Sequence, residues 1–175
     1  MRIYLQLCED DLRLYAPLLA STYNDLGNLY RSTKQLKPAK NAFEQALTIR
    51  RQLANDNPAT YLPDLAATLN DLGNAYADDK EYSQAESCLL KALEIHEKLA
   101  KDNSEAYLPD VAKNLSDLGT LYADSGKPPQ AEDSFQKSLE ILRTLAAMMF
   151  SVGTVANKLT MGTLQKALTP HQQSY

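Results

Sequence analysis

The sequence predicts an all-α protein, a right-handed α-solenoid (superhelix) of helix-turn-helix repeats. Tyr15, Tyr61 and Tyr107 are spaced by 46 residues, and a proline follows each tyrosine two positions later. Residues 61–101 align without a gap on residues 107–147, with 21 identities in 41 positions. A fixed period of this size is typical of solenoids, in which each repeat buries the hydrophobic face of its neighbour.

The period divides the chain into three repeats, residues 15–60, 61–106 and 107–147. Residues 1–14 match the end of a second helix, so we interpret them as a partial repeat. Residues 148–175 are expected to form a degenerate C-terminal helix and tail. Because the chain starts within a repeat, it is expected either to be a fragment of a longer array or to bury its ends against a second copy.

Each repeat is predicted to contain two amphipathic helices. In the middle repeat, Leu65, Leu69, Leu72 and Tyr76 recur every three or four residues, which places them on one helix face. Residues 78–81 are polar and few, and they predict a tight turn between the helices. The second helix carries a similar apolar stripe, made of Ala85, Leu89, Ala92, Leu93, Ile95 and Leu99.

Turn and capping residues mark the links between repeats. The runs 55–58 and 102–104, rich in Asn and Asp, are typical of helix caps. Pro63 leaves two alternatives: it lies in the first turn of its helix, or the helix begins at Pro58 and kinks at Pro63. Glycines in register within the predicted helices indicate a close helix crossing, since a helical glycine costs about 1 kcal/mol relative to alanine; these are Gly27, Gly73 and Gly119.

The composition indicates a cytoplasmic protein without nucleic-acid or membrane partners. The net charge of −4 argues against a nucleic-acid binder, which presents a basic face. No stretch reaches the roughly 18 apolar residues that span a bilayer. Two cysteines cannot build a disulfide framework and fit a reducing compartment. One basic run is interpreted as a solvated helix face: Arg31, Lys34, Lys37, Lys40, Arg50 and Arg51.

No motif in the sequence points to catalysis, a metal or a cofactor. The two histidines, His96 and His171, have no nucleophile or ligand at a meaningful spacing. CxxC, HExxH and glycine-rich phosphate-binding motifs are absent from the sequence. We therefore expect no enzymatic activity and no cofactor. We also expect that replacing His96 by alanine costs less than about 1 kcal/mol.

The repeat resembles the tetratricopeptide repeat (TPR). The middle repeat matches the spacings of that family at Leu72-Gly73, Tyr76, Tyr82, Ala85, Leu89 and Ala92. The long second helix and residues 110–115 are similar to the repeats of kinesin light chains. Pro128 and Ser138 depart from the pattern in the third repeat. The resemblance implies a helical solenoid that acts as a scaffold for binding proteins or peptides.

A second, polar stripe runs along the first helix of each repeat, and the period stacks these stripes side by side. In TPR arrays, the resemblance implies, matching positions line a concave groove in which asparagines bind the backbone of an extended peptide. An asparagine amide both donates and accepts, as a peptide unit does. The candidate groove residues are Asn24, Asn28, Arg31, Asn70, Asn74, Lys113, Ser116 and Thr120.

We expect the four asparagines to be exposed, and Arg31 and Lys113 to favour an acidic side chain or C-terminus in the ligand. The alternatives are that the stripe is only a solvated surface, or that self-association buries it.

The expected function is therefore non-enzymatic binding of a protein or peptide ligand. Two alternatives remain: a regulatory or sensor fragment of a larger multidomain protein, and structural self-assembly into a homo-oligomer through the chain ends. The tail has three alternatives, namely a cap on the last hairpin, a self-association surface, or a disordered segment. We expect residues 148–168 to be buried, on the same chain or on a partner.

Overall fold

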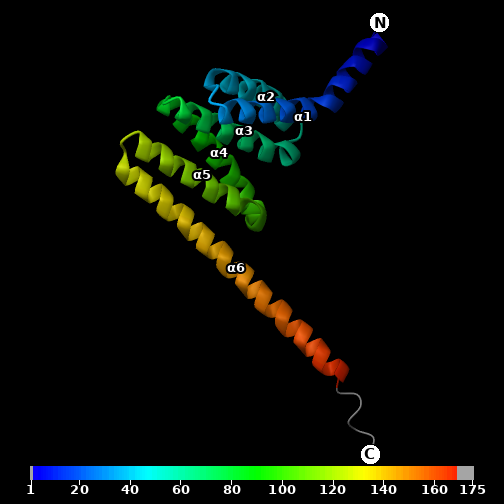
Figure 1. The fold of residues 1–175 in the computed structure, drawn as a ribbon. Coiled ribbons are helices and arrows are strands. Elements are labelled where there is room, and N and C mark those ends of the chain that lie inside the picture. Colours follow the sequence, from blue (N-terminus) through cyan, green and yellow to red (C-terminus); the bar gives the residue numbers. More distant parts are fainter. Residues whose placement is uncertain (1, 169–175) are drawn as a thin grey trace, which may run out of the picture.

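The computed structural model contains six α-helices packed side by side, and no strand, within residues 2–168 (Figure 1). It describes the backbone of these residues and the side chains of residues 14–149. The helices are α1 (Arg2–Ser32), α2 (Leu36–Asp56), α3 (Pro58–Asp78), α4 (Tyr82–Asp102), α5 (Ser104–Asp124) and α6 (Pro128–Leu168).

The helices form an inner and an outer layer. Each helix packs on the next one in the chain. In addition, the Cα atoms of α1 approach those of α3, and those of α3 approach those of α5, within 8 Å, whereas over the described residues those of α2 and α4 stay farther apart. Because the odd-numbered helices lie closer together, the array curves around them, and they form its inner, concave face. The predicted all-α solenoid is confirmed.

The helix breaks between repeats occur where the sequence predicts capping residues. The side chain of Asn57 accepts a hydrogen bond from the backbone N–H of Thr60 at 3.3 Å. Asn103 accepts one from Ala106 at 3.1 Å. These bonds satisfy backbone donors that have no partner within the helix. Helix α3 begins at Pro58, so of the two alternatives the one with Pro63 inside the helix is correct.

The turn within each repeat uses the same backbone conformation. Lys34, Lys80 and Gly126, spaced by 46 residues, have φ angles of 60°, 61° and 74°. The residue after each of them donates its N–H to the carbonyl of Tyr30, Tyr76 or Tyr122, at 2.8–2.9 Å. This is the Schellman pattern that ends a helix through one left-handed residue. It reverses the chain and brings the two helices of a repeat together.

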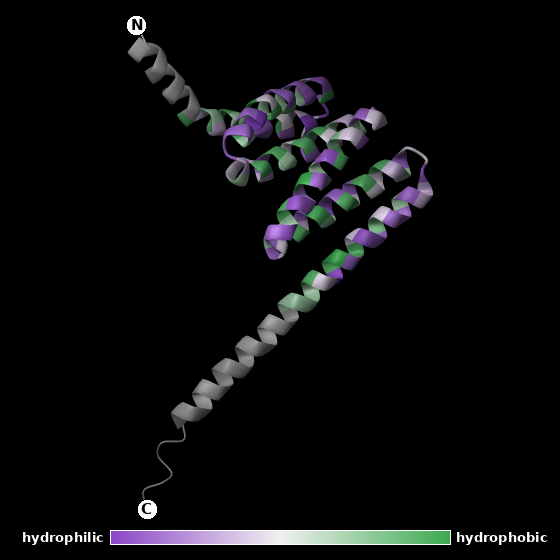
Figure 2. Cartoon of the chain, turned by 180° about the vertical axis from the view of Figure 1, so that it is seen from behind, coloured by the Kyte–Doolittle hydropathy of each residue, from purple (hydrophilic) through white to green (hydrophobic). Residues whose placement is uncertain are grey.

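The hydrophobic core lies between the two layers. Leu69 and Leu72 of α3 are buried in one cluster with Phe43 of α2, and Leu65 and Tyr76 pack against it. The predicted apolar stripe of the middle repeat is therefore confirmed. Figure 2 shows hydrophobic and hydrophilic residues alternating along the helices, as expected for amphipathic helices.

Each of the two inter-repeat interfaces contains an ion pair at equivalent positions, but the positive and negative residues are exchanged between the two. Lys40 of the first repeat lies 2.5 Å from Glu81 of the second. At the positions 46 residues later, Glu86 lies 3.0 Å from Lys127. The hydrogen bond from Lys127 lowers the pKa of Glu86. Because the charges are reversed, stacking the repeats in another order would place like charges together, which favours the native order.

The glycines in register mark the close crossings predicted from the sequence. A Cβ atom on Gly27 would lie 2.6 Å from the ring of Phe43. On Gly73 it would lie 2.8 Å from Leu89, and on Gly119 it would lie 2.7 Å from Phe135. These distances are shorter than carbon atoms in contact can adopt, so the absent side chain is what allows the helices to pack.

Replacing Gly27 with alanine is expected to lower the free energy of unfolding by about 1–3 kcal/mol, because the buried Phe43 ring has no room to move. Urea unfolding of the single variant, of Phe43→Leu and of the double variant would measure the coupling. Because a leucine side chain is smaller than the phenylalanine ring and can change its rotamer, Phe43→Leu should recover part of the loss. If Gly27→Ala stabilises the protein, as for an exposed helical glycine, the crossing is not the reason for the glycine.

Both ends of the array differ from the boundaries expected from the period. Helix α1 is continuous from Arg2, so residues 2–14 share a helix with the start of the first repeat. Helix α6 is continuous to Leu168, without a break near residue 147. The position of the caps Asn57 and Asn103 is occupied there by Met149, which has no side-chain acceptor to start a new helix. The expected burial of residues 148–168 falls mostly on side chains outside the described ones.

Candidate functional site

The eight predicted site residues all belong to inner-layer helices. Asn24, Asn28 and Arg31 come from α1, Asn70 and Asn74 from α3, and Lys113, Ser116 and Thr120 from α5. Because α3 adjoins both α1 and α5, the residues belong to one continuous inner layer.

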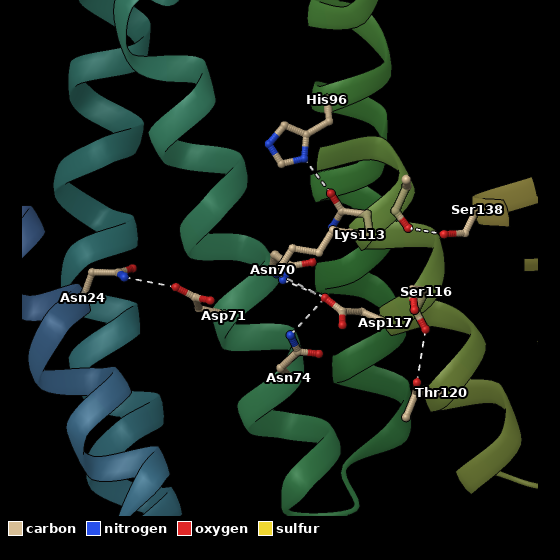
Figure 3. A network of polar contacts seen from close by, with 12 residues as sticks. Asn24, Asn70, Asp71, Asn74, His96, Lys113, Ser116, Asp117, Thr120 and Ser138 are labelled. Carbon is tan, nitrogen blue, oxygen red and sulfur yellow. Dashed lines mark hydrogen bonds and ion pairs between the residues drawn. The ribbon is translucent and has the colours of Figure 1, made fainter. Parts of the chain in front are cut away.

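The asparagines of one repeat bind an aspartate of the next. The amide of Asn24 donates to Asp71 at 3.0 Å, and the amide of Asn70 donates to Asp117 at 2.9 Å. Asn74 donates to the same Asp117 carboxylate at 3.1 Å. We call these five residues the inner-face ladder; Figure 3 shows Asn24 directed at Asp71, and Asn70 and Asn74 directed at Asp117. The ladder fastens neighbouring repeats to each other.

A buried polar network lies behind the ladder at the first interface. Arg50 of α2 donates to the backbone carbonyl of Asp64 at 2.9 Å and to the hydroxyl of Thr68. Thr68 in turn donates to the amide oxygen of Asn24 at 3.1 Å. Burial lowers the pKa of Arg50, and the carboxylates around it act in the opposite direction. An arginine stays charged in proteins, so its donors need these acceptors.

The second interface repeats this network with different residues. His96 occupies the position of Arg50, and its Nδ1 lies 2.5 Å from the amide oxygen of Asn114. Asn114 occupies the position of Thr68 and donates to the amide oxygen of Asn70. Because an amide oxygen only accepts, Nδ1 of His96 carries the proton. Among the described side chains, every buried polar atom has a partner.

Several expectations about exposure are wrong. Asn70 is only 3% exposed, and both ends of its amide are engaged within the protein. Arg50 is buried instead of lying on a solvated face. His96 is buried and hydrogen-bonded, so its replacement is expected to cost more than the sequence suggested. In each case the neighbouring repeat covers a polar residue that is not part of the apolar stripe of its own helix.

The remaining predicted residues are more accessible. Asn28, Lys113 and Thr120 are exposed, and Thr120 donates to the backbone carbonyl of Ser116 at 3.1 Å. Lys113 lies 3.4 Å from the carboxylate of Asp117.

Arg31 of α1 forms an ion pair with Asp78 of α3 at 2.8 Å. The two cations that were expected to attract an acidic ligand therefore each have a carboxylate beside them.

A cavity of about 470 Å³ opens on the inner face. Its walls combine three predicted residues with others that the sequence analysis missed: Arg31, Asn74, Ala77, Asp78, Lys80, Tyr82, Asp117, Thr120, Leu121 and Asp124. Three carboxylates face two cations, so the wall carries a formal charge of −1. The repeat itself could have revealed the missed carboxylates, since Asp78 and Asp124 are 46 residues apart, as are Asp71 and Asp117.

Other kinds of site have little support in the part of the chain that the structure describes. No group of three His, Cys, Asp or Glu side chains there could hold a metal ion. A helix long and apolar enough to cross a membrane is also not found in that part. Cys88 is a free, half-buried thiol, and burial raises its pKa.

Comparisons with known proteins identify the repeat. Residues 64–144 and residues 19–59 match two family models, each described as tetratricopeptide repeat, and both of the kinesin light chain type. No curated protein sequence matches the chain.

Two solved structures resemble the fold. The N-terminal domain of stress-induced protein-1 from C. elegans has a TM-score of 0.53 at 18% identity, covering 77% of this chain and 97% of that domain. BtubC (BKLC) from P. vanneervenii has a TM-score of 0.38 at 17% identity, covering 75% of this chain and 66% of the other. The first likeness supports the solenoid fold, and the second carries no argument.

Proposed function

Because the chain belongs to the tetratricopeptide repeat family, we propose that its inner face binds an extended segment of another protein. Repeats of this family generally mediate protein–protein interactions and typically act as non-enzymatic scaffolds. In general terms, the chain is therefore a protein-interaction scaffold. The segment, its site and the cytoplasmic location expected from the composition are proposals.

The observation that carries this proposal is the inner-face cavity, which contains Arg31, Asn74 and Thr120 among its walls. Asn74 uses one amide hydrogen for Asp117, so its other hydrogen and its oxygen remain for a ligand. Thr120 of α5 and Asn28 of α1 are exposed. An extended backbone needs donors and acceptors of this kind along its length.

The charges of the cavity favour a basic ligand over the acidic one expected from the sequence. Arg31 is paired with Asp78, whereas the side chains of Asp124 and Lys80 form no hydrogen bond or ion pair among the described residues, so the wall keeps its net charge of −1. The apolar parts of Ala77 and Leu121 also line the wall. They suit the aliphatic stem of a lysine or arginine whose charged end reaches the carboxylates.

The expected affinity is modest. A neutral hydrogen bond contributes about 0.5–1.5 kcal/mol, and a micromolar complex requires about 8 kcal/mol. Asn28, Asn74 and Thr120 alone cannot supply this after the cost of association. The cavity must therefore supply much of the binding free energy, through an ion pair with a ligand side chain and through apolar contact.

Replacing Asp124 with asparagine is expected to weaken binding of a basic extended peptide about 3–10-fold, because it removes the unpaired carboxylate of the cavity. A peptide-library screen on the wild type would supply the ligand, and titration calorimetry at low and high salt would measure its affinity. Salt should weaken the wild-type complex more than the variant complex.

The matched control is Asp102→Asn, which changes the net charge equally at an exposed site at the end of α4, outside the cavity. Equal losses in both variants would mean that only the overall charge matters. A screen that selects acidic peptides would contradict the proposed preference. A screen that selects no peptide would contradict the groove itself.

A further inference from the structure

The last repeat leaves uncovered the face that the following repeat buries in the other two. Phe43 and Leu89 are fully buried, whereas Phe135, at the same position of α6, is 41% exposed. Leu139 and Leu142 of α6 are 47% and 50% exposed, at the positions of Leu47/Leu93 and Arg50/His96. We call Phe135, Leu139 and Leu142 the end face.

The amino acids needed to cover the end face follow in the same chain. In the first interface, the helix that covers Phe43 and Leu47 contributes Leu69, Leu72 and Ala75 to one core cluster. The period assigns these three positions to Met161, Leu164 and Ala167 in the segment 150–168. The segment therefore has the apolar pattern of a covering helix, although the sequence analysis found it degenerate.

The same segment cannot reach the end face of its own chain in this structure. Folding back requires a helix break, and the position of the caps Asn57 and Asn103 is occupied by Met149. Helix α6 instead continues unbroken to Leu168 and projects from the stack (Figure 1). At about 1.5 Å per residue, Leu139 and Met161 are separated by roughly 33 Å along the helix.

Charge complements this apolar pattern. No Asp or Glu follows Arg143, and the segment 150–168 carries Lys158 and Lys166. Beside the end face, α6 carries exposed Glu132 and Glu140 together with one exposed cation, Arg143, which leaves a net charge of −1. A covering segment with positive charge therefore meets a rim with negative charge.

We propose that the covering segment comes from a second copy of the chain: residues 150–168 of each copy pack on the end face of the other. Leu139 and Met161 lie equally far in sequence from residue 150. If two α6 helices cross antiparallel near that residue, a two-fold axis relates them. Leu139 of each copy then lies beside Met161 of the other. Such a reciprocal exchange closes the assembly as a dimer and needs no helix break.

A cross-linking experiment with two differently tagged full-length chains tests this exchange. Both chains carry Cys8→Ser and Cys88→Ser; one also carries Leu139→Cys, and the other carries Met161→Cys. After mixing and equilibration, a short thiol-reactive linker is expected to join the two tags. In the matched control, Leu90→Cys replaces Leu139→Cys; Leu90 is exposed on α4, away from the end face, and no link is expected. Circular dichroism would verify that the variants are folded.

The wild-type chain supplies the independent measurement. Light scattering is expected to give twice the monomer mass, and this mass should fall toward that of a monomer only on dilution. A monomer at all concentrations would overturn the proposal. So would linkage within single chains that carry both Leu139→Cys and Met161→Cys, because the segment would then cover its own end face. A dimer without the expected link would also overturn it, since other surfaces would then join the copies.

Discussion

Replacing Leu72 with alanine is expected to lower the free energy of unfolding by about 2–5 kcal/mol. Leu72 is 3% exposed and lies in the core cluster with Phe43 and Leu69. Truncation removes apolar contacts with both layers and leaves a cavity that the helices cannot close, because the glycine crossings already hold them at their closest approach. Since every repeat is stabilised by its neighbours, a loss in the middle repeat affects the whole array.

Denaturant unfolding followed by circular dichroism measures this loss. The matched control is Leu90→Ala, a leucine on α4 that is 44% exposed, with an expected cost below about 1 kcal/mol. Equal costs for the two variants would contradict the assignment of the helix faces.

Replacing Asn114 with alanine is expected to cost about 2–4 kcal/mol, although alanine is the better helix former. Asn114 is 1% exposed, and its amide serves both His96 and Asn70. Without it, two buried polar groups lose a partner where water does not reach them, and each such group costs about 1–3 kcal/mol.

The comparison for Asn114 is Asn28→Ala, on the exposed part of the same inner face, which should leave stability nearly unchanged. Chemical denaturation of both variants gives the two free energies. A small cost at Asn114 would show that the buried network contributes little, and that the stacking of repeats depends on apolar contacts alone. The replacement of His96 should then be equally mild, as the sequence analysis expected.

The elements of this fold that repeat were predictable because each depends on local chemistry. Asn57 and Asn103 cap helices with their own side chains, and the turns at Lys34, Lys80 and Gly126 follow one backbone pattern. The periodic apolar residues have to face a core wherever a helix forms. Apart from the helix starts at Pro58 and near the chain ends, these signals are sufficient for the helices, the turns and the solenoid.

The sequence could predict which helix positions carry the candidate site residues, but not which groups these side chains contact. Helical spacing assigns Asn24, Asn70 and Asn74 to the inner layer, but it does not tell which groups the next repeat brings to them. The carboxylates of Asp71 and Asp117 arrive from the neighbouring helix, and they engage the amides that were expected to await a ligand. The proposed preference of the site for a basic ligand rests on this pairing and on Asp124.

The sequence by itself determined the family, the period, the helix faces and the close glycine crossings, because these follow from the residues of a single repeat. Only the tertiary structure decided that Asn70, Arg50 and His96 are buried, and that the end face of α6 is exposed. Burial of a polar side chain depends on the element that covers it. In a solenoid that element is the next repeat, 46 residues away.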